Sequence, residues 1–422
     1  MVHCRHMGRL QRFLDRFGPG FITGASDNDP SGIVTYTQVG AHFGLAQLWT
    51  AVFCLPFMGV MQEMVARIGM VTGEGLVASL RKDYPKWIMW SFVGLLFGAN
   101  TLNIGADLGA MADASRLLIP AIPFPVLVVS FTVLILLLEI FITYKTYAKI
   151  LKWFAFSLFG YIITAFLVTT DWGNVLAHSF IPTIQINRDF MMGLVAILGT
   201  TISPYLFIWQ SNEQVEEEIA KGRTTLRQRQ GATKQELKAM RKDVSTGMLF
   251  SQVITFCIMI TASAVFFSRG IDGITSASQA AKMLEPIAGN FSYILYAVGI
   301  IGTGLLAVPV LSASASYAMS DALGIRSGLF HKLKQAHGFY GAITVSTLIG
   351  LLINFLNLNH ISVLYWTAVI NGLVMAPLIG IILVIANDKR VMRGWHNGDL
   401  ANLIGLISFF VMTCAAVMFL VL

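Results

Sequence analysis

The chain has 422 residues, of which 55% are hydrophobic and only 12% are charged, and its formal net charge is +7. Soluble globular domains carry about 25% charged residues, so this composition excludes an ordinary soluble protein and predicts an integral membrane protein. The length leaves room for many membrane-spanning helices of about 20 residues each.

Apolar runs predict an all-α protein with eleven membrane-spanning segments, preceded by a basic, polar segment over residues 1–18. In chain order these spans lie near residues 19–43 (interrupted), 46–67, 87–111, 121–141, 147–169, 189–218 (interrupted), 244–267, 291–320, 338–357, 360–386 and 400–421. The longest polar insert, about Glu216 to Asp243, is expected to be a charged loop. The glutamates around its start are expected to form a solvated helix end, and they are Glu213, Glu216, Glu217 and Glu218.

Lysine and arginine residues gather on one side of this layout. With the N-terminus placed in the cytoplasm, 25 of the 29 Lys and Arg residues fall on the cytoplasmic side, and the other four are Arg116, Arg188, Arg269 and Lys282. Cytoplasmic loops of membrane proteins carry an excess of Lys and Arg. The pattern predicts a protein integral to the cell (plasma) membrane, with a cytoplasmic N-terminus and an external C-terminus. It also explains the net charge without a nucleic-acid partner.

The first span contains an unusually polar stretch from Gly24 to Gly32, with two carboxylates, Asp27 and Asp29, just before Pro30. A charged side chain at the bilayer centre costs at least about 3 kcal/mol on insertion scales, and such residues usually face a cavity and handle ions or substrate. Asp29 could act only as a helix N-cap ahead of a first-turn proline. Since Ser or Asn would cap at lower cost, we expect Asp29 to bind an ion, with Asp27 and Asn28 as further candidates.

The sixth span has a matching interruption at Thr200-Thr201-Ile202-Ser203-Pro204, where Ser203, like Asp29, is expected to cap the following half-helix. The two breaks are five spans apart, so the two halves of the chain face opposite ways. Interrupted helices at matching positions of two inverted halves are typical of secondary transporters with a site near the midplane. The sequence predicts a ten-helix core over 19–386, built from repeats of about 19–169 and 189–386, with an eleventh helix over 400–421.

Carboxylates and free backbone carbonyls are hard oxygen ligands suited to magnesium, calcium or manganese. Two aspartates would repel an anionic substrate, so we expect a divalent cation as the cargo, with no cofactor and no obligatory protein partner beyond the lipid bilayer. The paired breaks favour alternating access, with a cation channel as the alternative from another class. The sequence shows no nucleophile–base pair, phosphate loop or zinc motif, which speaks against an enzyme.

Several motifs resemble the Nramp family of metal transporters, and the resemblance covers essentially the whole chain. These motifs are Phe17-Gly18-Pro19-Gly20-Phe21, Asp29-Pro30, Val71-Thr72-Gly73 and the run from Gly199 to Ser211. The resemblance implies a LeuT-like fold, a 5+5 inverted repeat with metal bound between broken helices 1 and 6. It carries ligand roles over to the Asp29 side chain and to the carbonyl of Thr200.

Three positions depart from the family pattern. The family motifs Asp-Pro-Gly-Asn and Ala-x-x-Met-Pro-His place an asparagine ligand at Gly32, a methionine sulfur at Ser203 and a histidine at Tyr205. A thioether favours transition metals, so its loss favours hard ions, and the smaller side chains enlarge the pocket for a partly hydrated magnesium ion. The pattern is therefore similar to the NRAMP-related magnesium transporters, with a proton-coupled manganese or iron symporter as the alternative.

Two further spans carry polar residues. Asn100, Asn103 and Asp107 share one face of span 3, where Asp107 either serves the external vestibule or is a structural acid bonded to an asparagine. Asn371 in span 10 is a candidate ligand, directly or through water. Because Tyr205 replaces the family histidine, we expect transport without obligatory proton coupling.

Overall fold

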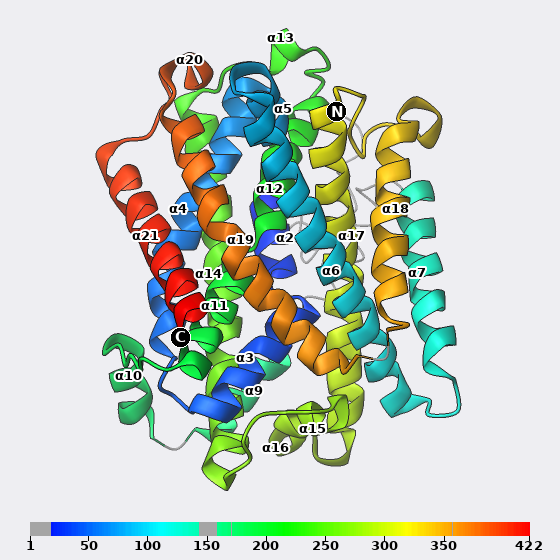
Figure 1. The fold of residues 1–422 in the computed structure, drawn as a ribbon, viewed down its shortest axis with the longest axis vertical. Coiled ribbons are helices and arrows are strands. Elements are labelled where there is room, and N and C mark those ends of the chain that lie inside the picture. The colour runs from blue at the N-terminus through cyan, green and yellow to red at the C-terminus, as the bar shows by residue number, and fades with distance from the viewer. Residues whose placement is uncertain (1–17, 143–157, 170, 357) are drawn as a thin grey trace, which may run out of the picture.

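The structure, a computed structural model, describes residues 18–142, 158–169, 171–356 and 358–422, and every regular element in these ranges is a helix (Figure 1). The helices of the first half are α2 (Pro19–Ser26), α3 (Pro30–Phe43), α4 (Trp49–Thr72), α5 (Leu76–Asp83), α6 (Lys86–Leu118), α7 (Phe124–Phe141), α9 (Phe159–Val168) and α10 (Trp172–Phe180). Those of the second half are α11 (Arg188–Thr201), α12 (Pro204–Ala220), α13 (Leu226–Arg229), α14 (Lys234–Val265), α15 (Ala277–Ala281), α16 (Glu285–Ala288), α17 (Ser292–Leu323), α18 (His337–Ile353), α19 (His360–Asn387), α20 (Lys389–Met392) and α21 (Asp399–Val421).

The predicted spans correspond to helices wherever the chain is described. Eight helices, counting α11 and α12 as one, are long and apolar enough to cross a membrane. The shorter apolar helices α9 and α18 and the broken pair α2–α3 account for the remaining predicted spans. Most of the N-terminal segment 1–18 and the first part of span 147–169 lie outside the described residues. The all-α architecture and the breaks in helices 1 and 6 are confirmed.

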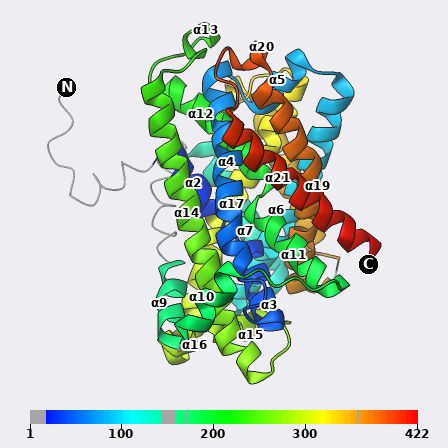
Figure 2. The same cartoon turned by 90° about the vertical axis from the view of Figure 1, so that its left-hand side faces the viewer.

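The short connecting helices separate to the two ends of the bundle. Helices α5, α13 and α20 lie at one end and α15 and α16 at the other, as both views show (Figures 1 and 2). The first end carries the lysine- and arginine-rich connections and is therefore the predicted cytoplasmic end. The orientation across the membrane stays a prediction.

Glycines upstream of the two breaks bring helix backbones into direct contact. A Cβ on Gly24 of α2 would stand 2.1 Å from the carbonyl oxygen of Gly247 on α14. A Cβ on Gly199 of α11 would stand 2.2 Å from the carbonyl oxygen of Ala368 on α19. Small residues allow this close approach between helices in a membrane. The two half-helices that lead into the breaks are thus packed in the same manner against different partners.

The amino end of α2 is capped from another helix. The N-cap residue Gly18 offers no side chain, and its amide donates to Asp243 Oδ1 on α14 at 2.9 Å. The Gly20 amide donates to Asp243 Oδ2 at 2.7 Å. Farther along α2, Thr23 Oγ1 donates to Gln210 Oε1 on α12 at 2.6 Å. The two bonds to Asp243 satisfy amides that a helix terminus leaves unpaired. Together with the bond from Thr23, they fix α2 against α12 and α14.

The connection between α12 and α14 is shorter than the predicted charged loop. Helix α12 continues to Ala220, and α14 begins at Lys234, where Thr233 and Glu236 form a capping box. The prediction of a solvated helix end is wrong for Glu213 and Glu218, which are both buried. Periodicity cannot reveal this burial, because the residues that cover these side chains are distant in the sequence.

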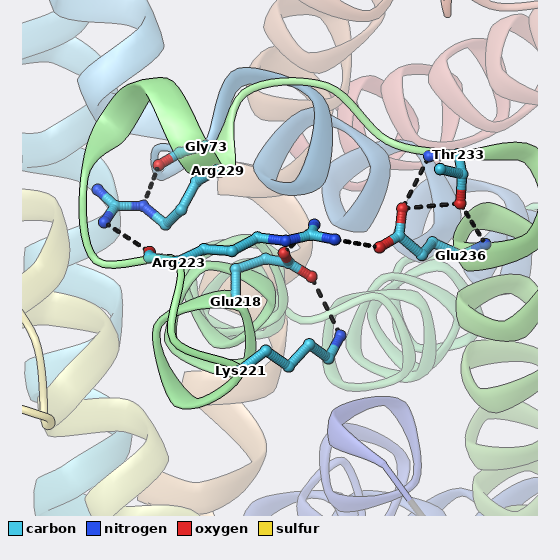
Figure 3. A network of polar contacts seen from close by, with 7 residues as sticks. All are labelled: Gly73, Glu218, Lys221, Arg223, Arg229, Thr233 and Glu236. Atoms are coloured by element: carbon cyan, nitrogen blue, oxygen red, sulfur yellow. Dashed lines mark hydrogen bonds and ion pairs between the residues drawn. The ribbon is translucent and has the colours of Figure 1, made fainter.

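Figure 3 shows the charged network that holds this connection. Glu218 accepts from Lys221 Nζ at 3.0 Å and pairs with Arg223, whose Nη2 lies 2.7 Å from Glu236 Oε1. The hydrogen bond to Glu236, together with the charge of Glu218, raises the pKa of Arg223. Arg229 Nε donates to the Gly73 carbonyl at the end of α4 at 3.1 Å. The network ties together α4, α12 and the start of α14.

Candidate functional site

The first helix break is formed by Asp27, Asn28 and Asp29, all of them buried. Helix α2 ends at Ser26, and α3 begins with Pro30 in its first turn. Asp29 Oδ1 accepts from the Gly32 amide at 2.6 Å, which confirms Asp29 as the N-cap of α3. Capping does not exhaust this carboxylate, because an ionised carboxyl group offers about four acceptor positions.

The second break differs in detail from the first. Ser203 occupies the N-cap position of α12 ahead of Pro204, but its side chain makes no capping hydrogen bond. Ser203 Oγ instead donates to the Thr200 carbonyl at 2.6 Å. The prediction that Ser203 caps α12 is therefore wrong. The last carbonyls of a helix have no partner within the helix, and the Ser203 hydroxyl donates to one of them at the end of α11 instead of accepting from an amide of α12.

The two breaks lie against each other. Tyr205 OH donates to the Ser26 carbonyl, the last residue of α2, at 2.8 Å. On the other side, a Cβ on Gly32 would stand 3.1 Å from Thr200 Oγ1, 3.2 Å from Asp29 Oδ1 and 3.3 Å from the Asp27 carbonyl oxygen. Three oxygens from both breaks therefore converge on the bare backbone of Gly32. We call Asp29, Gly32, Thr200 and the Asp27 carbonyl the oxygen cluster.

Asn103 of α6 connects the oxygen cluster to two other helices. Its Nδ2 donates to Asp29 Oδ2 at 2.9 Å and to Asp107 Oδ2 at 3.0 Å. Its Oδ1 accepts from Asn371 Nδ2 of α19 at 3.1 Å. Asn371 thus reaches Asp29 through Asn103. Of the two interpretations of Asp107, the structure shows the acid bonded to an asparagine.

The side chains of Asp27 and Asn28 point to a different helix. Ser251 Oγ of α14 donates to Asp27 Oδ2 at 2.5 Å and accepts from Asn28 Nδ2 at 3.1 Å. Asp27 Oδ1 and Asn28 Oδ1 are buried and have no hydrogen-bond partner among the described residues. Asp27 therefore contributes to two places, because its carbonyl belongs to the oxygen cluster and its carboxyl group lies against α14.

Two residues that complete this arrangement were not predicted as site residues, although Asn103 was noted on the polar face of span 3. Asn103 carried a signal, because it shares a helical face with Asp107 four residues later. Ser251 carried none, since a single serine in an apolar span is usually a packing residue. Its partners are 224 and 223 residues away in the chain. Contacts at such separation follow from the tertiary fold and not from any local pattern.

Negative charge in the site has no counterpart from basic side chains. Asp27, Asp29 and Asp107 are buried, and no Lys or Arg of the described residues forms a hydrogen bond or ion pair with them. Burying an unpaired carboxylate is costly, so such a site attracts a cation or a proton. Within the described residues no group of three or more His, Cys, Asp or Glu side chains could hold a metal. Backbone oxygens, hydroxyl groups or water would have to complete any metal coordination here.

Comparison with known proteins places this arrangement in a family. The family model described as Natural resistance-associated macrophage protein-like (Nramp) matches residues 20–422. The divalent metal cation transporter MntH of Caldanaerobacter subterraneus subsp. tengcongensis is 24% identical over 412 residues, covering 96% of this chain and 92% of the relative. MntH of Klebsiella pneumoniae subsp. pneumoniae is 24% identical over 396 residues, covering 92% and 88%.

Solved structures agree with the fold. The Eremococcus coleocola manganese transporter, in complex with an aromatic bis-isothiourea substituted compound, superposes with a TM-score of 0.74 at 18% identity, covering 99% of this chain and 88% of that one. Mhp1, a nucleobase-cation-symport-1 family transporter in a closed conformation, gives 0.59 at 13% identity, covering 96% and 92%. These likenesses confirm the LeuT-like fold with its broken helices. Since the family model spans nearly the whole chain, this protein belongs to the Nramp family and is an integral membrane transporter, not an enzyme.

Proposed function

We propose that this protein is a secondary transporter that moves hard divalent cations, magnesium and/or manganese, into the cell by alternating access. The observation that carries the proposal is the oxygen cluster, in which Asp29, Thr200 and the Asp27 carbonyl converge on Gly32. These are the hard ligands that such cations prefer. The buried aspartates give the site negative charge that no described basic residue balances. The relatives named as divalent metal cation transporters support the same class of cargo.

The preference for hard ions follows from what surrounds the oxygen cluster. Ser203 stands where the family motif has a sulfur ligand, and its hydroxyl is bonded to the Thr200 carbonyl. Gly32 stands where the family has an asparagine, and its lack of a side chain leaves its backbone open to three oxygens. Magnesium prefers oxygen ligands. An oxygen-lined site without a sulfur ligand therefore suits it, and the ion would be cargo and not a resident cofactor.

The remaining features of the proposal follow the sequence predictions. The transport unit would comprise residues 19–386, as two inverted repeats of about 19–169 and 189–386, with 400–421 as an added helix. The N-terminus would be cytoplasmic and the C-terminus external in the plasma membrane. Neither an obligatory protein partner nor a cofactor would be needed.

The decisive experiment separates ion binding by Asp29 from capping. Asn caps a helix about as well as Asp, so Asp29→Asn keeps the cap of α3 and removes the charge. Asp171→Asn is the matched control, because Asp171 caps the short helix α10 by accepting from the Asn174 amide at 3.0 Å and is exposed. Both variants are reconstituted into proteoliposomes, and saturable uptake of magnesium and manganese is measured.

We expect Asp29→Asn to abolish saturable uptake or to raise the half-saturating ion concentration by about tenfold or more, the effect of losing one charged ligand worth about 1.4 kcal/mol. Asp171→Asn should transport as the wild type does. Wild-type kinetics in Asp29→Asn would mean that Asp29 only caps α3. A wild-type protein that takes up manganese but no magnesium would favour the manganese symporter, the alternative that the manganese transporter fold supports.

A further inference from the structure

An apolar groove of about 880 Å³ lies between α4, α14 and α21, and no residue of the oxygen cluster lines it. Figure 2 shows the side of the molecule on which these three helices lie. The walls of the groove are mainly apolar and include Leu55, Val60, Met248, Leu249 and Ile404. Helix α21 exposes many large apolar side chains, as expected for a helix that faces lipid. The groove is therefore of a kind that accommodates an acyl chain.

One end of the groove is formed by a charged triad, Glu63, Arg67 and Arg241. Arg241 Nε donates to Glu63 Oε1 at 3.0 Å, and Arg67 Nη2 lies 3.5 Å from Glu63 Oε2. One carboxylate therefore serves two guanidinium groups, and the triad carries one excess positive charge. Glu63 and Arg67 have the i, i+4 spacing of a helical ion pair and are part of this larger group.

Arg67 supplies the observation that points to a ligand. It is 3% exposed, and its two terminal nitrogens bond to Asn397 and to the His396 carbonyl. Its Nε is buried and has no hydrogen-bond partner among the described residues. A buried donor on a charged group is rarely left unpaired, because the desolvation penalty is then not offset. Arg67 is one of the residues that line the groove.

The amino end of α21 lies at the same end of the groove, where Asp399 in the first turn offsets its dipole and leaves the triad as the source of excess positive charge. Its N-cap is Gly398, which has no side chain to pair with the first amides, and Gly398, Asp399 and Leu400 all line the groove. Amides at a helix amino end favour anions. Asp399 is exposed and lies in the first turn, where its charge is already matched to the helix dipole.

We propose that this groove binds one anionic glycerophospholipid of the cytoplasmic leaflet. Its phosphate would lie between Arg241 and Arg67, and an acyl chain would follow the apolar wall toward Leu55 and Ile404. Guanidinium groups bind phosphate oxygens in a bidentate manner. The leaflet follows from the predicted orientation, and anionic lipids are enriched at the cytoplasmic surface. The lipid would join α21 to the transporter core at α4 and α14.

Two variants test the two halves of the site. Arg241→Gln removes a headgroup contact, and Lys242→Gln is its control, because Lys242 is the next residue, is exposed and does not line the groove. Gly59→Phe fills the groove, since a Cβ on Gly59 meets nothing within 4 Å. Gly94→Phe is the control for that change. A Cβ on Gly94 also meets nothing within 4 Å, and Gly94 lies on the exposed face of α6, outside the groove.

The purified full-length protein in detergent is titrated with phosphatidylglycerol, with phosphatidylcholine of the same acyl chains, and with inorganic phosphate. Thermal unfolding midpoints report stabilisation by bound lipid, and native mass spectrometry counts bound lipids. We expect phosphatidylglycerol to raise the midpoint and to bind as one tightly held molecule. We expect the other two probes to do neither. Arg241→Gln and Gly59→Phe should each weaken the apparent lipid affinity by about tenfold, whereas both controls keep it.

The lipid-dependent shift is read for each variant against its own lipid-free midpoint, so a variant that is less stable by itself does not confuse the result. Equal stabilisation by phosphatidylcholine would overturn the proposal, because the triad would then not distinguish an anionic from a zwitterionic headgroup. Unchanged affinity in both test variants would overturn it as well, since the lipid would be bound elsewhere. Neither result would bear on ion transport at Asp29.

Discussion

We expect single residues around Gly32 to determine which ion the proposed site binds. Asp29 is engaged by three donors, the Gly32 amide, the Ser31 hydroxyl and the Asn103 amide group. These bonds occupy most of the roughly four acceptor positions of its carboxylate, so an ion would share Asp29 with them. An ion held by Asp29 must take its other ligands from Thr200, the Asp27 carbonyl or water. Small changes at neighbouring positions should consequently alter affinity or selectivity without removing the fold.

Ser203→Met tests selectivity. The change adds a soft sulfur and releases the Thr200 carbonyl from the Ser203 hydroxyl, which now lies 2.6 Å away. We expect the manganese-to-magnesium uptake ratio to rise by about tenfold, the effect of one ligand worth about 1.4 kcal/mol. Ser203→Ala is the control, because it releases the same carbonyl without adding sulfur. An unchanged ratio in Ser203→Met, with uptake retained, would show that position 203 does not contact the ion.

Gly32→Ala tests the oxygen cluster itself. The added methyl group would lie between 3.1 and 3.3 Å from three oxygens, Thr200 Oγ1, Asp29 Oδ1 and the Asp27 carbonyl. We expect ion affinity to fall by about tenfold. Helix propensity alone favours alanine by about 1 kcal/mol, so stability should hold. Gly94→Ala, in open space on α6, controls for the general effect of the substitution. Uptake kinetics give the ion affinity of both variants, and the unfolding midpoint gives their stability. A normal ion affinity in Gly32→Ala would count against the oxygen cluster as the ion site.

The sequence predicted these residues only in part. Asp29, Gly32 and Thr200 stood out because a carboxylate, a proline and polar residues interrupt apolar runs, and the family motif aligned them. The roles of Ser203 and Asn28 could not be predicted, since each depends on which hydroxyl or carbonyl lies nearest in three dimensions. Ser203 bonds backward to Thr200, and Asn28 turns to Ser251 on α14.

At the scale of elements, both ends of α2 are bonded to neighbouring helices. Asp243 accepts from two amides at its beginning, and Tyr205 donates to the Ser26 carbonyl at its end. A helix of eight residues has little stability of its own. Its position therefore depends on contacts supplied by α12 and α14.

Asp243→Asn tests this dependence. The amide side chain keeps one acceptor but loses the charge and the second acceptor, so the amino end of α2 should open more often. Hydrogen bonds to charged groups contribute roughly 1.5–3 kcal/mol each, and we expect amide exchange over residues 19–26 to accelerate by about tenfold. Exchange mass spectrometry measures this, with the exposed Asp272→Asn as control. Unchanged exchange would mean that packing against α14 alone holds α2.

Helix boundaries were predictable where the signal is local. The apolar runs predicted α17, α18, α19 and α21 to within a few residues. Helix α14 begins ten residues before the predicted span, at Lys234 instead of 244, because polar residues can continue a helix beyond the membrane. Thr233 and Glu236 form a capping box that marks this start in the sequence itself. The burial of Glu213 and Glu218, in contrast, depends on distant neighbours that no window along the chain contains.

At the scale of the whole molecule, we ask whether protons cross the membrane together with the metal ion. Tyr205 donates its hydroxyl hydrogen to the Ser26 carbonyl, and no described histidine hydrogen-bonds to Asp27, Asp29 or Asp107. We therefore expect metal uptake without obligatory proton movement. Proteoliposomes loaded with a pH-sensitive dye receive substrate ion outside, and the lumen should keep its pH. Metal-dependent acidification, absent from empty liposomes, would establish coupling and point to the buried aspartates as carriers.

The contact between Gly24 and Gly247 has a consequence for how firmly α2 can be held. Two surfaces of bare backbone have no side chains to interlock, and glycine loses no side-chain entropy on contact. These two surfaces can separate or slide without any change of side-chain rotamer, so side-chain packing adds little barrier to movement of α2 along α14. We therefore expect the free energy of separating α2 from α14 to depend largely on the hydrogen bonds that α2 makes. The two to Asp243 are charge-assisted and are worth roughly 1.5–3 kcal/mol each, or about tenfold or more in the populations.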